Sequence, residues 1–596
     1  MNPVDRDDTL REAAAAVALH DYPAALARLE ALLAHRAEDA EALTAYASLL
    51  ATLHRAEAAI AALDRAIAIA PERSAALLLR GHLLGNSGRH GEALADFECA
   101  LAWQPGHADA LAGKAAALQA LTRYAEALPV LDALLGQMPE SRQARRERGV
   151  LLYRLNRYPE ALCDFEWILA TDPADPAALI VGGYAAGQLG RHEVALRWME
   201  QALCLDPLNV DALVGSGVAL SQLQRLPEAL ASIESALRIA PDSIDALNAR
   251  AATLALDNRL EEALADYDRS LTARPGQPLA RSDRALVLLA LGDYHNGFRE
   301  WEVRWEIPPL RYRYLPTAAP RWRGDAALDE RTILLYHEQG FGDTLQCVRY
   351  VPRLVTLGAR VLLRVPAELC ALMVGLEGIG GVIAETEPLP PHDFQCPLMS
   401  LPLAFGSTLD TIPAVIPYLR ADHRKVDYWR SRLPATPGLK VGLVWAGKPG
   451  SQIAGRRDIP LARLLPLLRG ATAAGAVIVS LQNEVSSPDA AILRSLAGSV
   501  WLPGLLRDFA DTAALIETLD LVISVDTAVA HLAGALGKPV WILNRYAACW
   551  RWLRGRSDSP WYPTARLFRQ SSPGDWRGAI DEVGEALRAF MAAGTS

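Results

Sequence analysis

The chain has 596 residues and a formal net charge of −9, with 60 Lys and Arg against 69 Asp and Glu. That length exceeds what one hydrophobic core supports, so several structural units are expected. A mildly acidic chain does not attract nucleic acid through its overall charge, and we expect no nucleic-acid partner. Seven scattered cysteines without a CxxC pair exclude a disulfide framework and a cysteine metal site of ordinary spacing.

The N-terminal residues, MNPVDRDDTLRE, lack the basic patch and apolar stretch of a secretory signal. The longest apolar stretch, Leu521 to Leu543, is interrupted by Asp526, His531 and Lys538, which does not suit a membrane helix. We therefore expect a cytoplasmic protein without a membrane span.

A 34-residue period fills the first half of the chain. Small residues recur at this spacing from Ala25 to Ala263, with Gly297 next, and would let two helices approach closely. Eight prolines share the period and would end the second helix of each pair, because proline cannot continue the hydrogen-bond ladder. They are Pro71, Pro105, Pro139, Pro173, Pro207, Pro241, Pro275 and Pro309. The array resembles the tetratricopeptide repeat (TPR) family, and we expect an α solenoid of about nine repeats within residues 1–309.

Two parts of the array differ from the rest. The fourth repeat is locally basic, with Arg142, Arg145, Arg146 and Arg148, which indicates either a solvated helix face or a contact with a protein acceptor. The ninth repeat is rich in aromatic residues, including Trp301 and Trp305, and is typical of a terminal cap that packs onto the next domain. Residues 310–331 are expected to form a linker.

The second half alternates short apolar strands with helical stretches. Continuous apolar runs separated by helices predict parallel sheets covered on both faces. The break from Pro413 to Lys425 predicts two Rossmann-like halves, 332–425 and 426–596, facing a cleft. The expected strands are Thr332–Tyr336, Arg360–Val365, Lys440–Trp445, Val477–Leu481, Leu521–Val525 and Val540–Leu543.

Three loops follow such strands, where ligands of parallel sheets bind. The first, HEQGFGDT, offers Glu338, Gly340, Gly342 and Asp343; an aspartate at the start of a helix is also a common N-cap. The second, AGKPGSQIAGRRDIP, carries Gly450 and the cations Lys448, Arg456 and Arg457, which suit either a phosphate site or a solvated loop.

The third loop, SVDTAVAH, places Asp526 and Thr527 before a helix and His531 one turn into it. A histidine in a helix is often a hydrogen-bonded core group, but its position after a strand favours a role in binding. We find no Asp-x-Asp cluster at a strand end in this half, so we expect no metal site.

Several segments together resemble the bacterial TPR-fused glycosyltransferases of the GT-B class, which are related to the heptosyltransferases. They include EQGFGDTLQCVRY, VGLVWAGKP, RRDIPLARLLPLL, DTAALIETLDLVISVDTAVAHLAGALGKPVWIL and WRWL. The resemblance implies that Asp343 is the catalytic base. Glu338, a second carboxylate in the same loop, is the reserve candidate. The resemblance also implies that Asp526, Thr527 and His531 bind the nucleotide sugar, and that Arg456 or Arg457 supplies the basic residue of the donor loop. A metal-independent enzyme without a cofactor is expected.

Within this class the layout is most similar to the flagellin glycosyltransferases. That resemblance implies a CMP-activated nonulosonic acid of pseudaminic or legionaminic type as donor. The acceptor would be a Ser or Thr of flagellin, held by the TPR domain. Two alternatives stay open: a heptosyltransferase-like enzyme that uses ADP-heptose or a UDP-sugar on another acceptor, and a non-enzymatic TPR scaffold.

Overall fold

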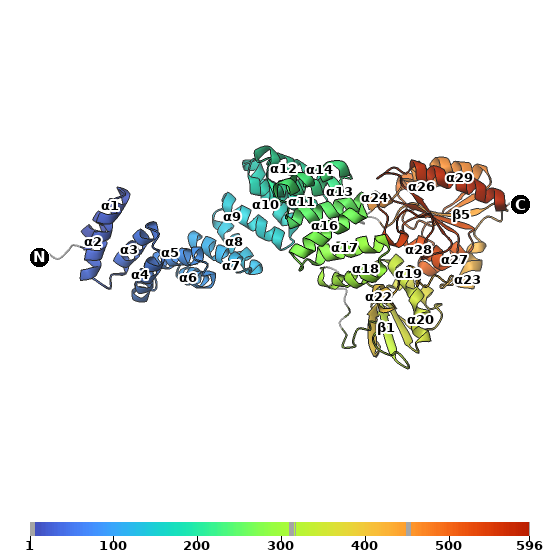
Figure 1. Ribbon diagram of the computed structural model, residues 1–596, viewed down its shortest axis with the longest axis horizontal. Coiled ribbons are helices and arrows are strands. Elements are labelled where there is room, and N and C mark those ends of the chain that lie inside the picture. The colour runs from blue at the N-terminus through green and yellow to red at the C-terminus, as the bar shows by residue number, and fades with distance from the viewer. Residues whose placement is uncertain (1–5, 309–314, 316, 449–453, 595–596) are drawn as a thin grey trace. The chain divides into compact units, whose positions relative to one another are not determined.

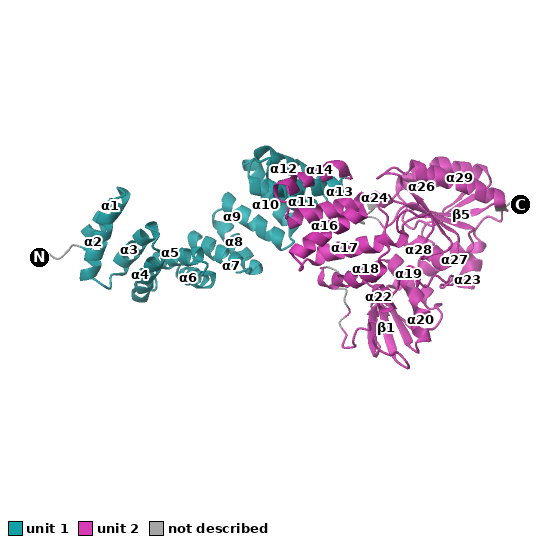
Figure 2. Cartoon of the chain, in the orientation of Figure 1, with its two compact units in different colours: residues 1–223 teal, residues 224–596 magenta. Residues whose placement is uncertain are grey.

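The computed structural model describes residues 6–308, 315, 317–448 and 454–594. Its contacts divide the chain into two compact units, residues 1–223 and 224–596 (Figure 2). The division lies within the helical repeats and not at the expected linker, part of which, 309–314 and 316, is outside the described residues. No described helix is long and apolar enough to cross a membrane.

Unit 1 consists of helices, and all but the last of them pair two by two (Figure 1). The predicted alanine column is confirmed at the helix contacts, where Ala25, Ala59 and Ala93 are fully buried. The helices are α1 Arg6–Ala18, α2 Tyr22–His35, α3 Ala40–Thr52, α4 Ala56–Ile69, α5 Ser74–Asn86, α6 His90–Trp103, α7 Ala108–Ala120, α8 Tyr124–Gln137, α9 Arg142–Arg154, α10 Tyr158–Thr171, α11 Pro176–Gln188, α12 His192–Leu205 and α13 Val210–Gln222.

The turn inside each pair contains one residue with a left-handed backbone, again every 34 residues. His20, His54 and Thr122 have φ near +58°, and Gly88 and Gly190 near +75°. A left-handed residue commonly ends a helix because it redirects the chain while the last carbonyls stay hydrogen-bonded. Since non-glycine residues fill several of these positions, this column could not be recognised from residue types.

The arginines of the fourth repeat are paired within unit 1. Arg148 bridges Asp164 at 2.7 Å and Asp132 at 2.8 Å. Arg142 pairs with Asp172 and Arg146 with Asp175, while the guanidinium of Arg145 lies 4.0 Å from the centre of the Trp167 ring. These cations stabilise the contacts between neighbouring helices of the solenoid, so they do not form a basic patch that is free to bind a partner.

Unit 2 begins with the last repeats and continues into two parallel sheets. The helices are α14 Leu226–Ile239, α15 Ile244–Leu256, α16 Leu260–Ala273, α17 Pro278–Leu291 and α18 Tyr294–Trp301, followed by the 3₁₀ turn η1 Glu302–Glu306. Tyr294, Phe298 and Trp301 are buried in one hydrophobic cluster with residues of both sheets. The aromatic terminal repeat therefore packs onto the α/β region, as predicted.

The first sheet has the order β3-β2-β1-β4. It comprises β1 Thr332–Tyr336, β2 Arg360–Val365, β3 Ile379–Ala384 and β4 Phe394–Pro397, with helices α19 Phe341–Cys347, α20 Val351–Thr356, α21 Ala367–Met373, α22 Leu401–Ala404 and α23 His423–Arg430. Strand β1 pairs in parallel with β2 and β4, so their carboxyl ends lie at one edge.

The second sheet has the order β10-β9-β8-β5-β6-β7 and is also parallel. It comprises β5 Lys440–Val444, β6 Val477–Ser480, β7 Ser499–Val500, β8 Leu521–Val525, β9 Val540–Asn544 and β10 Ala565–Arg569. Its helices are α24 Ala454–Arg457, α25 Leu461–Ala473, α26 Ser487–Ser495, α27 Phe509–Glu517, α28 Ala528–Ala535 and α29 Arg577–Gly594. All six predicted strands are present, and β3, β4, β7 and β10 were missed.

Candidate active site

A cavity of about 1010 Å³ lies in unit 2, where the loops after β1, β5, β8 and β9 meet. These loops leave the carboxyl ends of parallel strands, the edge at which such sheets bind ligands. Among the described residues, every predicted site residue except Arg456 lines this cavity: Glu338, Gly340, Gly342, Asp343, Lys448, Arg457, Asp526, Thr527 and His531. The structure thus brings together residues that are almost 200 positions apart.

Asp343 occupies the first turn of α19, and its two carboxylate oxygens have different partners. Oδ2 accepts a hydrogen bond from the Gly340 backbone N–H at 2.7 Å and so caps the helix. Oδ1 pairs with the guanidinium of Arg551. Asp343 is therefore not the N-cap that the sequence suggested: Gly340 is the N-cap, and Asp343 is the third helical residue, whose side chain reaches back to it.

Glu338 is buried and holds the loop after β1 to the end of the repeats. Its oxygens accept hydrogen bonds from Arg304 Nε at 2.8 Å and from the Met399 backbone N–H at 2.9 Å. Arg304 is 1 % exposed and also donates to Ser400 Oγ at 2.7 Å. Burial raises the pKa of Glu338, and the positive charge of Arg304 opposes that shift. These contacts give Glu338 a clear structural role.

The loop after β5 is folded around the Arg457 side chain. Arg457 Nε donates to Asp458 Oδ1 at 2.9 Å, and the same oxygen accepts from the Gly447 backbone N–H at 3.0 Å. A Cβ on Gly447 would lie 1.7 Å from Arg457 Nη2, so only glycine leaves room for this guanidinium. Lys448 is exposed, and residues 449–453, including the predicted Gly450, lie outside the described residues.

Arg456 lies in α24 and does not line the cavity. Burial and the nearby positive charge of Arg545 lower its pKa. Arg545, which follows β9, does line the cavity. Of the two arginines in the predicted pair, the structure therefore places Arg457 at the site.

The loop after β8 leads into α28 and carries the predicted residues Asp526, Thr527 and His531, which are buried or half-buried. Thr527 is the N-cap, but its side chain contacts Ser524 Oγ at 3.0 Å and does not cap the helix. His531 is 4 % exposed, lies 2.9 Å from Tyr562 OH through Nδ1 and stacks on Trp552. Its Nε2 is 4.0 Å from Asp526 Oδ1.

Burial lowers the pKa of His531 to about 4, although Asp526 opposes the shift. The imidazole is therefore neutral at physiological pH. A Cβ on Gly342 would lie 2.8 Å from His531 Cδ2, so this glycine lets α19 approach α28. His531 both lines the cavity and joins the loops of the two sheets.

Sequence reasoning missed three arginines that line the cavity: Arg364 in β2, and Arg545 and Arg551 after β9. Arg551 is buried, donates from Nε to Gln346 Oε1 at 2.6 Å and pairs with Asp343. Within the described residues, Arg545 Nε and Arg457 Nη2 are buried N–H groups with no hydrogen-bond partner. Its position directly after the predicted parallel strand Val540–Leu543 was the signal that could have identified Arg545.

Unpartnered guanidinium N–H groups beside the start of a helix form a site suited to an anion such as a phosphate. A carboxylate, Asp343, lies in the same cavity. Among the described residues no group of three or more His, Cys, Asp or Glu side chains could hold a metal ion. The arrangement can neutralise a phosphate at one wall and accept a proton at the other.

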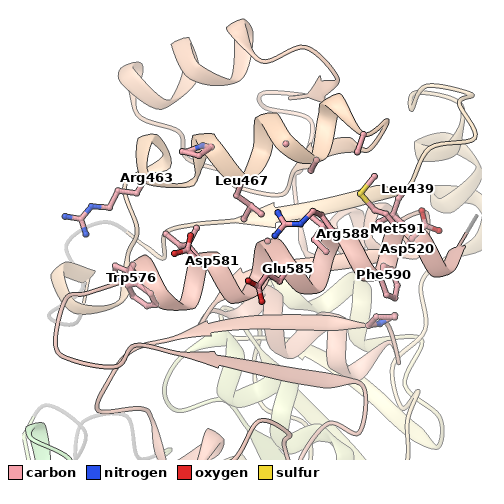
Figure 3. A pocket seen from close by; sticks show the side chains of 18 of the residues that line it. Leu439, Arg463, Leu467, Asp520, Trp576, Asp581, Glu585, Arg588, Phe590 and Met591 are labelled. Carbon is pink, nitrogen blue, oxygen red and sulfur yellow. The ribbon is translucent and has the colours of Figure 1, made fainter.

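A larger hollow of about 2650 Å³ lies elsewhere in unit 2. Figure 3 shows Arg463 and Leu467 of α25 on one side of it, and Trp576 with Asp581 and Glu585 of the following helix α29 on the other. The hollow is lined by residues that precede β5, β8 and β9, and therefore lies away from the carboxyl ends of those strands. The smaller cavity is the better candidate for chemistry.

Comparison with known proteins gives two family matches. Residues 10–74, 113–178 and 180–244 match the tetratricopeptide repeat model. Residues 476–548, which include Asp526, Thr527 and His531, match the model of glycosyltransferase family 9 (heptosyltransferase). The chain therefore combines tetratricopeptide repeats with a segment similar to glycosyltransferase family 9. Asp343, Lys448 and Arg457 lie outside the second match.

The chain is 28% identical to Protein FlbA of Caulobacter vibrioides (strain ATCC 19089 / CIP 103742 / CB 15) over 332 residues, 52% of this chain and 55% of FlbA. It thus spans about half the length of that relative. A tetratricopeptide repeat protein from Parabacteroides merdae ATCC 43184 is 19% identical, covering 42% of this chain and 98% of its own, with a TM-score of 0.35. A thermophilic TPR protein from Thermus thermophilus is 27% identical, covering 29% and 97%, with a TM-score of 0.27.

Proposed function

We propose that the chain is a metal-independent GT-B glycosyltransferase that modifies a protein hydroxyl. The donor is a nucleotide sugar, in the finest form of the proposal a CMP-activated nonulosonic acid, and the acceptor is a Ser or Thr of flagellin held by the repeats. The cytoplasm is the proposed location. The observation that carries the enzymatic part is the cavity that Asp343 shares with Arg457 and Arg545. The second sheet, whose strands these arginines follow, contains the match to glycosyltransferase family 9.

In this reaction the bond between the anomeric carbon of the sugar and the phosphate oxygen breaks while a bond to the acceptor oxygen forms. Asp343 takes the hydroxyl proton, and Arg551 holds that carboxylate in place. Arg457, Arg545 and Lys448, with the first amides of α28, stabilise the departing nucleotide phosphate. Glu338 was the reserve base, but its buried pairing with Arg304 favours Asp343.

The test is to incubate the purified protein with flagellin and, separately, CMP-, UDP- and ADP-sugars, and to read the acceptor by intact mass. A mass increase with a CMP-nonulosonic acid supports the full proposal. An increase only with ADP-heptose or a UDP-sugar favours the heptosyltransferase-like alternative, which the family 9 match supports. No increase of flagellin with any of these donors contradicts the flagellin proposal and favours a transferase with another acceptor, or a scaffold.

A further inference from the structure

The segment 545–554, which follows β9, has the cavity on one side and the last repeats on the other. Arg545, Cys549 and Arg551 line the cavity. Tyr546, Trp550 and Arg554, interspersed with them, contact repeat residues. One short segment therefore connects the candidate active site to the solenoid within unit 2.

The polar contacts of this segment reach the turn between α15 and α16. Tyr546 OH donates to the Asp257 carbonyl at 3.4 Å, and Arg554 Nη1 donates to the Asn258 carbonyl at 3.4 Å. Arg554 also pairs with Glu261 at the start of α16. Two of these acceptors are backbone carbonyls, so the contact depends on the shape of the repeat turn.

The apolar contact is made by Trp550, the neighbour of Arg551. Its ring packs edge-on against Phe298 and Tyr294 of α18, with 5.5 and 5.9 Å between the ring centres. The Arg551 guanidinium lies 4.3 Å from the centre of the Trp550 ring and extends from there to Asp343. A shift of Trp550 on the repeats would therefore move the guanidinium that holds Asp343.

We propose that the repeat turn 257–261 and α18 position Arg551, so that residues outside the cavity control how the candidate base is held. Tyr546, Arg554 and Glu261 are then positioning residues, and the repeats do more than bind an acceptor. This inference rests on the proposed function for its meaning in catalysis. Its structural part can be tested without any transfer reaction.

Cys549 is the probe, because it is half-buried on this segment and its Sγ lies 3.0 Å from Arg551 Nη1. The variant Tyr546→Phe with Arg554→Gln removes the three polar contacts with the turn. The rate of iodoacetamide labelling at each cysteine is read by peptide mass spectrometry in the full chain. We expect Cys549 to react about 3- to 10-fold faster, with the exposed Cys99, Cys163 and Cys204 unchanged.

Arg556→Gln is the matched control, because Arg556 pairs with Asp558 and not with the repeats. Arg556→Gln should leave the labelling rate at Cys549 unchanged. The charge swap Glu261→Arg with Arg554→Glu rebuilds the ion pair with its charges exchanged, so its labelling rate at Cys549 should be closer to the wild-type value than that of the double variant. An unchanged rate in the double variant overturns the proposal. Equal acceleration at the buried Cys396 overturns it too, because that result means general loosening.

Where transfer is detected, the double variant should lower kcat about 3- to 10-fold with little change in the donor KM. An unchanged kcat alongside faster labelling would overturn the catalytic part of the inference. Absence of transfer in the wild-type chain contradicts the proposed function, while the labelling rates still decide whether the repeats position the segment.

Discussion

At the scale of single residues, Asp343 is the side chain on which the proposed reaction depends. Asparagine keeps an oxygen that can accept the Gly340 N–H, so the cap of α19 survives. It cannot take a proton from the acceptor. We expect Asp343→Asn to lower the transfer rate per folded molecule by roughly 10²- to 10⁴-fold. The variant also leaves the buried Arg551 without its carboxylate, so its thermal unfolding temperature should be lower than that of the wild type.

Glu338→Gln is the comparison for that variant. It leaves the buried Arg304 without its carboxylate, which should cost about 3 kcal/mol of stability. The rate per folded molecule should stay near the wild-type value. If Glu338→Gln keeps normal stability but loses transfer while Asp343→Asn stays active, then Glu338 is the base and Asp343 is the structural residue.

His531 should make unit 2 less stable in acid. The pKa of His531 is about 4 in the folded protein and about 6.5 in the unfolded chain, so between these values the unfolded chain binds a proton that the folded protein does not. The free energy of unfolding is therefore highest above pH 6.5 and decreases as the pH falls toward 4. Over that pH range this single protonation lowers the free energy of unfolding by about 3 kcal/mol. His531→Gln should narrow the difference between the unfolding midpoints at pH 7 and pH 5; an unchanged difference would show that other groups cause the acid sensitivity.

At the scale of elements, the donor side takes one arginine from each of two segments that follow parallel strands. Arg457 follows β5 and Arg545 follows β9, and each has a buried N–H without a partner among the described residues. Arg457→Gln and Arg545→Gln should each weaken nucleotide binding by roughly 10- to 150-fold, because a charge-assisted hydrogen bond contributes roughly 1.5–3 kcal/mol.

Calorimetric titration of the donor nucleotide measures this effect. Arg463→Gln, on the far hollow of the same sheet, is the control and should bind normally. Adding EDTA should leave binding and transfer unchanged. Equal weakening by Arg463→Gln, or dependence on Mg²⁺, would contradict the proposed phosphate site.

Elements whose signal is local could be predicted from the sequence. The apolar runs identified β1, β2 and β8 with the bounds that the structure has, and the 34-residue columns identified the repeats. Strand β3 was missed because IGGVIA contains two glycines, and β7 because it has two residues. Arg551 escaped notice because its importance comes from Asp343, 208 positions earlier, and no spacing records a contact made by tertiary packing.

At the scale of the whole molecule, the end of the repeats and the division of contacts do not coincide. The sequence places a boundary near residue 310, whereas the contacts divide at 223/224. A cut at 310 would remove Tyr294 and Arg304, leaving Trp561 Nε1 and Glu338 without the partners they have at 2.9 and 2.8 Å. The aromatic core would also become exposed, which favours aggregation.

We therefore expect fragment 224–596 to be soluble and to bind the donor nucleotide, and fragment 310–596 to aggregate. Size-exclusion chromatography and the same titration decide between them. If the earlier repeats hold the acceptor, fragment 1–223 should bind flagellin by itself, because solenoid repeats contact mainly their neighbours and fold locally. A soluble 310–596 fragment that binds donor would show that the last repeats are dispensable for the site, and flagellin binding confined to 224–596 would assign acceptor recognition to the unit that carries the cavity.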